Sequence, residues 1–238
     1  MNFPRDHLSY SSVSKYLQCP KRWHFDYVIV PEKKKEGLAL GLGSVYHSAI
    51  EGLYTTGDFD NGKKLIVDFA SQNGRFAQKE IEKIGVCFEN YYRQIYPQYA
   101  SRVERIEMKD KVEIGGVEVP LEYRIDLVTT DGVLVDHKTV GRMKPNISYS
   151  LQFDLYAYAY YRNYGTLPKR VEYHYAYKTT GGVESEGKSV KMAEVLKAVS
   201  CVQGVARGIK EDMFTPTYGK HCDFCPHKEI CDREFGAI

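Results

Sequence analysis

Three cysteines lie within ten residues in the segment CDFCPHKEIC, at positions 222, 225 and 231. Cysteines at this spacing are typical ligands of zinc or of an iron–sulfur cluster, and a structural site of either kind usually has four protein ligands. Three cysteines are therefore an incomplete set. The fold must bring a fourth ligand to this segment from elsewhere in the sequence, and this requirement constrains the whole chain.

The composition is that of an ordinary globular protein. The 238 residues are 43% hydrophobic and 27% charged, which excludes disordered and collagen-like classes. The net charge of +2 neither requires nor excludes a nucleic-acid partner. The opening MNFPRDHLSY lacks the apolar core of a signal peptide, and no apolar run approaches a membrane span. We expect a cytoplasmic protein without membrane contact, whose six cysteines bind metal or are buried thiols.

The apolar pattern predicts helices near both ends and a sheet between them. Two short helices are expected in the opening segment, with Ser11 or Ser12 as the cap and Pro20 in the first turn of the second. Residues 44–100 have helical spacing, whereas 101–190 show the period of two that is typical of strands, interrupted by one helix. A last helix is expected near 192–209. The pattern predicts an α/β (α+β) fold with a mixed central sheet flanked by helices.

One hairpin carries two aspartates and a lysine, in the segment YRIDLVTTDGVLVDHKT. Asp136 and Lys138 are two residues apart, so their side chains lie on the same face of a strand. A two-residue loop would place Asp126 opposite His137. A three-residue loop with Gly132 in the left-handed conformation places it opposite Asp136, and we predict this second register.

Opposed carboxylates cost stability unless a cation lies between them. Hard oxygen ligands select magnesium or manganese, so the hairpin predicts a site for one of these ions. The alternative from the same residues is a solvated hairpin face with scattered charges.

The spacing of Asp126 from the tripeptide Asp136-His137-Lys138 resembles the PD-(D/E)XK nuclease superfamily. Further matches resemble its RecB-like branch: Gly43 and His47 in GSVYH, and Gln152 with Tyr156 in QFDLY. The resemblance implies a restriction-endonuclease-like core whose metal ligands are His47, Asp126, Asp136 and the backbone carbonyl of His137. Lys138 would orient the attacking water, while Gln152 and Tyr156 would complete the catalytic site chiefly by holding the strand.

Cys19, which precedes Pro20, together with Cys222, Cys225 and Cys231 resembles the split cysteine set of the iron–sulfur members of this branch. These include the AddB nuclease domain and the RecB-like exonucleases of CRISPR adaptation. The resemblance implies a 4Fe-4S cluster that ties residue 19 to the C-terminal segment. Spacing alone leaves Zn²⁺ open, with Cys19, His221 or His227 as the fourth ligand. We expect Cys87 and Cys201 to be buried thiols.

The resemblance implies a single nuclease domain over residues 1–238: a mostly helical segment at 44–100, a sheet with the active-site core at 101–190, and a staple formed by residue 19 and 222–231. The implied activity is Mg²⁺- or Mn²⁺-dependent exonuclease cleavage of single-stranded DNA or DNA ends. Arg142, Lys144 and Arg162 are candidate DNA contacts. Glu107 is expected to be an exposed strand charge, with a further carboxylate of the site as the alternative.

Recombination or CRISPR-adaptation proteins are possible partners. Two alternatives stay open: a non-catalytic zinc-containing DNA-binding module, and a nuclease-fold subunit that is active only in a complex.

Overall fold

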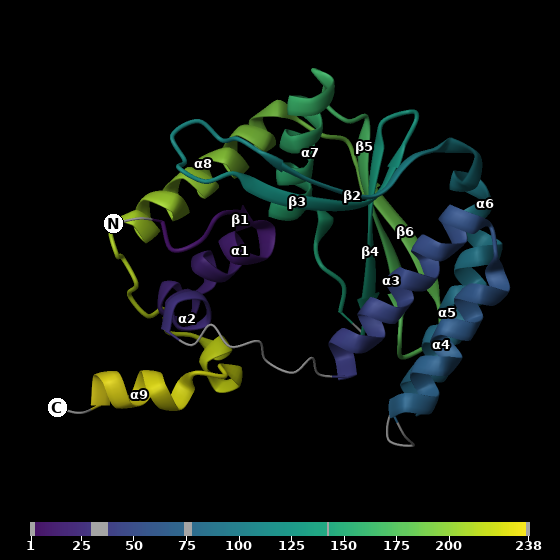
Figure 1. Ribbon diagram of the computed structural model, residues 1–238, viewed down its shortest axis with the longest axis horizontal. Coiled ribbons are helices and arrows are strands. Elements are labelled where there is room, and N and C mark those ends of the chain that lie inside the picture. Colours follow the sequence, from purple (N-terminus) through teal and green to yellow (C-terminus); the bar gives the residue numbers. More distant parts are fainter. Residues whose placement is uncertain (1–2, 30–37, 74–77, 142, 237–238) are drawn as a thin grey trace. The chain divides into compact units, whose positions relative to one another are not determined.

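The computed structural model describes residues 3–29, 38–73, 78–141 and 143–236 (Figure 1). The chain divides into two compact units, and each is built from separate segments of sequence. Unit 1 comprises Met1–Lys34, Lys111–Tyr123 and Leu196–Ile238, and unit 2 comprises Lys35–Asp110 and Arg124–Val195. The expected single domain stays a prediction. No helix in the described ranges is long and apolar enough to cross a membrane.

Unit 2 contains the central sheet and the helices that cover it. Its helices are α3 (Leu38–Thr56), α4 (Phe59–Asn73), α5 (Gln78–Gln94), α6 (Tyr96–Tyr99) and α7 (Leu151–Tyr164), with short 3-10 turns at Ala100–Arg102 and Ile147–Tyr149. Its strands are β2 (Val103–Val112), β3 (Leu121–Thr129), β4 (Val133–Val140), β5 (Arg170–Tyr177) and β6 (Val183–Lys188), of which β2 and β3 each have one end in unit 1.

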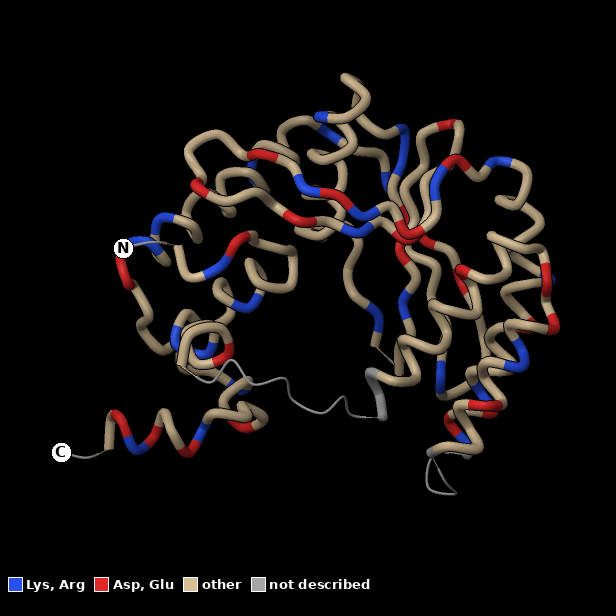
Figure 2. Tube along the Cα trace, in the orientation of Figure 1, with Lys and Arg blue, Asp and Glu red and all other residues tan. Residues whose placement is uncertain are grey.

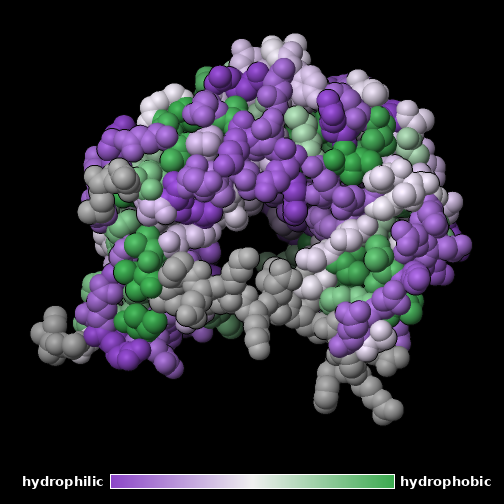
Figure 3. All heavy atoms as spheres, in the orientation of Figure 1, coloured by the Kyte–Doolittle hydropathy of each residue, from purple (hydrophilic) through white to green (hydrophobic). Residues whose placement is uncertain are grey.

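The strand order in unit 2 is β3-β4-β5-β6, with β2 beside β3. β4 pairs antiparallel with β3 and parallel with β5, and β6 returns antiparallel to β5. This mixed sheet with flanking helices confirms the predicted fold class. β4 is central and mostly buried, which explains its apolar sequence. β2 is largely exposed, and hydrophilic side chains cover it in Figure 3.

One apolar cluster joins α3, α4 and α5 to the sheet. Its helical members include Leu42, Leu53 and Phe88, and the sheet contributes Leu127 and Val135 among others. Alternate residues of β3 and β4 therefore belong to the core, and the intervening residues point to the opposite face. This alternation leaves Asp126 and Asp136 on the other side of the sheet from the cluster.

α7 begins and ends where its sequence provides caps. The Ser150 hydroxyl accepts a hydrogen bond from the Phe153 backbone N–H, and Gly165 ends the helix in the left-handed conformation with φ +74°. Gln152 and Tyr156 are thereby fixed one helical turn apart on a buried face.

Unit 1 contains the N-terminal helices and both parts of the cysteine set. Its elements are β1 (Leu8–Ser9), α1 (Tyr10–Gln18), α2 (Pro20–His24), a π-helical turn (Phe25–Ile29), most of α8 (Met192–Lys210), a 3-10 turn (Lys220–Phe224) and α9 (Lys228–Gly236). Pro20 begins α2 as predicted. The predicted cap of α1 is wrong: the Ser9 hydroxyl caps this helix, because β1 extends to Ser9 and the helix starts directly after it.

Candidate active site

The β3–β4 hairpin places two aspartates opposite each other. Its loop has three residues, 130–132, and Gly132 has φ +77°. Leu127 pairs with Val135, and the same register sets Asp126 opposite Asp136. The predicted register is confirmed. Acidic residues, red in Figure 2, gather where β2, β3 and β4 meet in that view.

Asp126 is a buried carboxylate with few compensating contacts. Its side chain is 5% exposed, and Oδ2 accepts a 2.7 Å hydrogen bond from the His137 backbone N–H. Burial and the neighbouring charge of Asp136 raise the pKa of Asp126 well above its ordinary value. The ionised form of this carboxyl group therefore lacks a sufficient positive partner in the protein itself.

Asp136 is held from both sides. Gln152 Nε2 donates a 2.7 Å hydrogen bond to Asp136 Oδ1 and also contacts the Tyr156 hydroxyl at 2.8 Å. Lys138 Nζ lies 2.7 Å from Asp136 Oδ2, although no hydrogen bond of good geometry reaches this buried oxygen. Burial, with the charges of the two aspartates, raises the pKa of Tyr156, so it stays a neutral phenol. Gln152 and Tyr156 thus fix one carboxylate oxygen and leave the other for a cation.

His47, Glu107 and Asp126 bring three possible metal-ligand atoms within 4.8 Å of one another. Within the described ranges they are the one such group of three. His47 Nδ1 lies 3.5 Å from Asp126 Oδ2, and burial lowers the pKa of His47, which favours the neutral, metal-binding imidazole. Asp136, expected in the same ligand set, is instead bonded to Gln152 and Lys138 and lies outside this group.

Glu107 joins this group, although the sequence analysis favoured an exposed strand charge over a carboxylate of the site. Its side chain is 21% exposed and lies 3.1 Å from Arg124 Nε, so the expected exposed charge is wrong. Burial raises the pKa of its carboxyl group. Its backbone has φ +47°, which is uncommon for a residue with a side chain and strains the strand. The alternating pattern of β2 contains no signal for this local turn of the backbone.

Two of the three predicted DNA contacts, Lys144 and Arg162, have partners within the described part of the chain. Lys144 Nζ lies 2.6 Å from Glu184 and 2.8 Å from Glu186, so its charge is matched locally. Arg162 Nη1 donates a 2.9 Å hydrogen bond to the Tyr158 hydroxyl. Arg142 lies outside the described residues. The DNA-binding role of all three stays a prediction.

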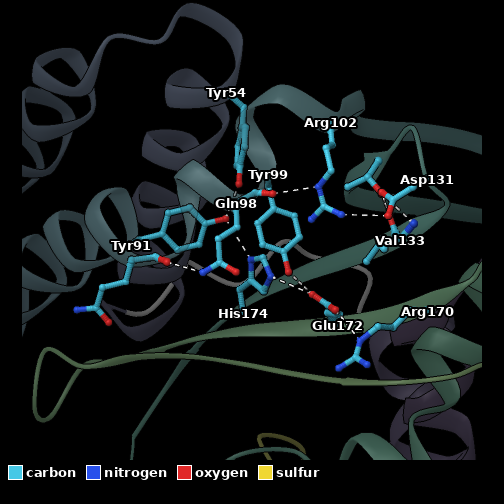
Figure 4. Close-up of polar contacts among 12 residues, drawn as sticks. Tyr54, Tyr91, Gln98, Tyr99, Arg102, Asp131, Val133, Arg170, Glu172 and His174 are labelled. Atoms are coloured by element: carbon cyan, nitrogen blue, oxygen red, sulfur yellow. Dashed lines mark hydrogen bonds and ion pairs between the residues drawn. The ribbon is translucent and has the colours of Figure 1, made fainter.

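A buried polar network supports the strand that carries Asp136 (Figure 4). The Tyr91 hydroxyl contacts His174 Nδ1 at 3.1 Å, and the Tyr99 hydroxyl donates a hydrogen bond to Glu172. Burial opposes ionisation of Glu172, but contacts with His174 and Tyr99 prevail and lower its pKa to about 2. The His137 ring packs 5.4 Å from the His174 ring, centroid to centroid. The network therefore supports the face of β4 that carries the His137 ring, opposite the face that carries Asp136.

The four predicted cluster cysteines meet in unit 1. Cys19, Cys222, Cys225 and Cys231 line one cavity of about 410 Å³. The Cys19 sulfur accepts 3.5 Å hydrogen bonds from the backbone N–H groups of Arg22 and Thr217, as sulfur ligands of metal clusters commonly do.

The other cysteine and histidine candidates lie in different surroundings. His227 Nε2 bonds to Asp26 Oδ1 at 2.6 Å, whereas His221 lines the cavity and contacts the Thr217 carbonyl. Cys87 is a buried thiol as expected, but Cys201 is exposed, because it lies on the solvent side of α8.

Comparison with known proteins agrees with this geometry. The family model of the PD-(D/E)XK nuclease superfamily matches residues 7–232. The crystal structure of a candidate exonuclease from Eubacterium rectale has a TM-score of 0.61 and 16% identity, over 93% of this chain and 88% of that chain. A second solved structure, of a protein with only a serial designation, has a TM-score of 0.46 and 12% identity, over 95% and 86%. A comparison with curated proteins gives no match. With the family model extending over nearly its whole length, the chain belongs to the PD-(D/E)XK nuclease superfamily.

Proposed function

We propose that the protein is a metal-dependent deoxyribonuclease that acts as an exonuclease on single-stranded DNA or DNA ends. One observation carries this proposal. The ligand atoms of His47 in α3, Glu107 in β2 and Asp126 in β3 converge within 4.8 Å, and the hairpin of β3 and β4 also carries the ion pair of Asp136 and Lys138. A non-catalytic binding module has no reason to bury two opposed carboxylates.

The residues of the site fit magnesium or manganese. The donors are carboxylate oxygens and one imidazole, to which the His137 carbonyl is added by resemblance. Asp136 Oδ2 is buried without a well-formed hydrogen bond, and burial keeps the pKa of Asp126 high, so both carboxylates call for positive charge. Such an ion, when bound, lowers the pKa of a water molecule and stabilises negative charge on phosphate.

Three residues of the chain act beside the proposed metal ion: Lys138 on the water and the phosphate, and Gln152 and Tyr156 on the position of Asp136. Lys138 presents an ammonium group at the site, where it can orient the attacking water and stabilise charge that develops on the phosphate. Gln152 holds Asp136 through Oδ1, and Tyr156 in turn contacts Gln152. These two are positioning residues.

A 4Fe-4S cluster is the proposed occupant of the cysteine cavity. Tetrahedral zinc with four sulfur ligands would require sulfur atoms ~3.8 Å apart. No three of the four cysteine sulfurs, all in the described part of the chain, lie within 4.8 Å of one another. This wider spacing and the volume of about 410 Å³ support a multi-atom cluster over Zn²⁺. We further propose a cytoplasmic location, and recombination or CRISPR-adaptation proteins as partners.

The decisive test is cleavage of single-stranded DNA labelled at the 5′ or the 3′ end, by anaerobically purified protein, with Mg²⁺ or Mn²⁺. Asp136→Ala is the matched inactive variant. Metal-dependent release of label that disappears in Asp136→Ala supports the proposal, and the label released first gives the polarity. Undiminished cleavage by a pure Asp136→Ala preparation would refute the assignment.

A further inference from the structure

A cavity of about 500 Å³ opens beside the proposed metal site in unit 2. His47 and Glu107 line one part of it, and Arg124, Thr139 and Lys178 line another. The lining does not include the ion pair of Asp136 and Lys138. Two of the proposed metal ligands therefore line one part of the cavity, and its other part extends beyond the ion pair of Asp136 and Lys138.

Helix α3 presents a polar face to this cavity. Ser44, His47, Ser48 and Glu51 recur at the spacing of one helical face, and all four line the cavity. Gly43 of the same helix lies beside β4, since a Cβ atom there would be in van der Waals contact with Thr139 Oγ1, 3.4 Å away. Hydroxyl groups from the helix and from β4 can thus donate hydrogen bonds into the cavity.

Lys178 is the cation of this cavity for which the described part of the chain provides no anionic partner. Its backbone N–H donates a 3.0 Å hydrogen bond to the Val140 carbonyl, which fixes the residue just beyond the end of β5. Its side chain is half-buried, and none of the described residues forms an ion pair or hydrogen bond with Nζ. Lys144 and Lys188 of the same unit each contact two carboxylates. An ammonium group that lines a cavity and has no carboxylate among the described residues is available to bind an anion.

We propose that Lys178, with the hydroxyls of Ser44 and Thr139, binds a phosphate of the DNA strand other than the phosphate that is cleaved. The proposal rests on the proposed nuclease function. The position of the cavity supports it, because Lys138 serves the reacting phosphate and Lys178 lies outside that ion pair. Glu51 and Glu107 also line the cavity and repel an anion, so the phosphate should bind when a divalent cation offsets their charge.

The test combines protein variants with neutral DNA linkages. Binding is measured in an Asp136→Ala background, with Mn²⁺, for single-stranded oligonucleotides that each carry one uncharged methylphosphonate linkage. Lys178→Ala should weaken binding of the unmodified strand about tenfold and reduce the slope of log affinity against log salt by ~0.7. Lys178→Arg should retain binding. Lys63→Ala, which removes a lysine paired with Glu89 on another helix, should have no effect.

At one position other than the scissile linkage, the methylphosphonate should weaken binding to the Asp136→Ala protein. The same methylphosphonate should cause no further loss of affinity when Lys178→Ala is added. This non-additivity would identify the phosphate that Lys178 contacts. Equal losses in both proteins at every linkage, or non-additivity only at the scissile linkage, would overturn the inference. Cleavage by the unmutated chain is assayed in parallel. If the unmutated chain cleaves DNA but Lys178→Ala and the methylphosphonates act additively, the phosphate site alone is rejected. If the chain neither binds nor cleaves DNA, the nuclease proposal is rejected as well.

Discussion

At the scale of single residues, the carboxylates of Asp126 and Asp136 repel each other when both are ionised, and a bound cation would reduce this repulsion. Asp126 and Asp136 are 5% and 2% exposed and stand opposite each other in one hairpin. Gln152 donates a hydrogen bond to one oxygen of Asp136 and Lys138 lies beside the other, whereas Asp126 accepts a backbone N–H and faces a histidine whose neutral form burial favours. On the proposed function, protons and the metal ion compete for Asp126.

This competition predicts a pH-dependent metal affinity. The raised pKa of Asp126 means that its protonated form persists above the usual carboxyl range near pH 4. Affinity for Mn²⁺ should fall as the pH is lowered through this raised pKa, and binding should release protons. Calorimetry in buffers of different ionisation enthalpy would detect the release. Binding that is independent of pH between pH 5 and 8, without proton release, would contradict the assignment.

Glu107 should contribute directly to metal binding. Glu107→Gln removes a charged ligand, so we expect Mn²⁺ affinity to fall at least about tenfold, the loss that even indirect partners of a metal cause. Glu104→Gln changes an exposed glutamate of the same strand and is the matched control. Titration of each variant with Mn²⁺, followed by electron paramagnetic resonance, measures the difference. Equal affinities of the two variants would remove Glu107 from the ligand set.

At the scale of elements, the sequence predicts the β3–β4 hairpin well and the elements around it less well. Alternating apolar residues and a glycine in the loop determine both the strands and their register, since a one-residue slip would expose core side chains. The position of Glu107 depends on one left-handed residue within β2, which no periodicity encodes. The pairing of Lys144 with two glutamates of β6 depends on contacts distant in sequence, so its neutralised charge could not be predicted either.

The hairpin loop gives a stability prediction. Gly132→Ala places a Cβ atom in the left-handed region, 3.3 Å from the Tyr160 hydroxyl, and should destabilise the protein by about 1–2 kcal/mol. Gly85→Ala in α5 meets no atom within 4 Å and should stabilise it by about 0.5–1 kcal/mol. Urea denaturation of both variants tests the opposite signs. A Gly132→Ala protein as stable as the parent would argue against the three-residue loop.

At the scale of the whole molecule, unit 1 is assembled from three distant segments of chain. Cys19 lines its cysteine cavity together with a C-terminal segment roughly 200 residues away in sequence. Bringing the ends of so long a loop together costs conformational entropy, which a cross-link offsets. A metal cluster at this point would hold the first and last parts of the unit together.

Loss of one ligand should therefore affect unit 1 selectively. Cys225→Ser should reduce bound iron and increase hydrogen exchange at α1, α2 and α9, while the sheet of unit 2 stays protected. Cys201→Ser, which changes an exposed thiol of α8, is the control and should retain the iron. Normal iron content and unchanged exchange in Cys225→Ser would exclude Cys225 as a cluster ligand.

The alternation of β4 has a consequence for how an inactive protein could arise. Val135 and His137 face the helices while Asp136 faces the site, so the residues that stabilise the strand and those proposed for chemistry alternate along one segment. A shift of the strand by one residue would turn Asp136 and Lys138 toward the apolar cluster and would destabilise the fold. The strand register that the fold requires is therefore also the register that places Asp136 and Lys138 in the site. Only replacement of these side chains themselves could remove the proposed activity and leave the stability of the fold intact.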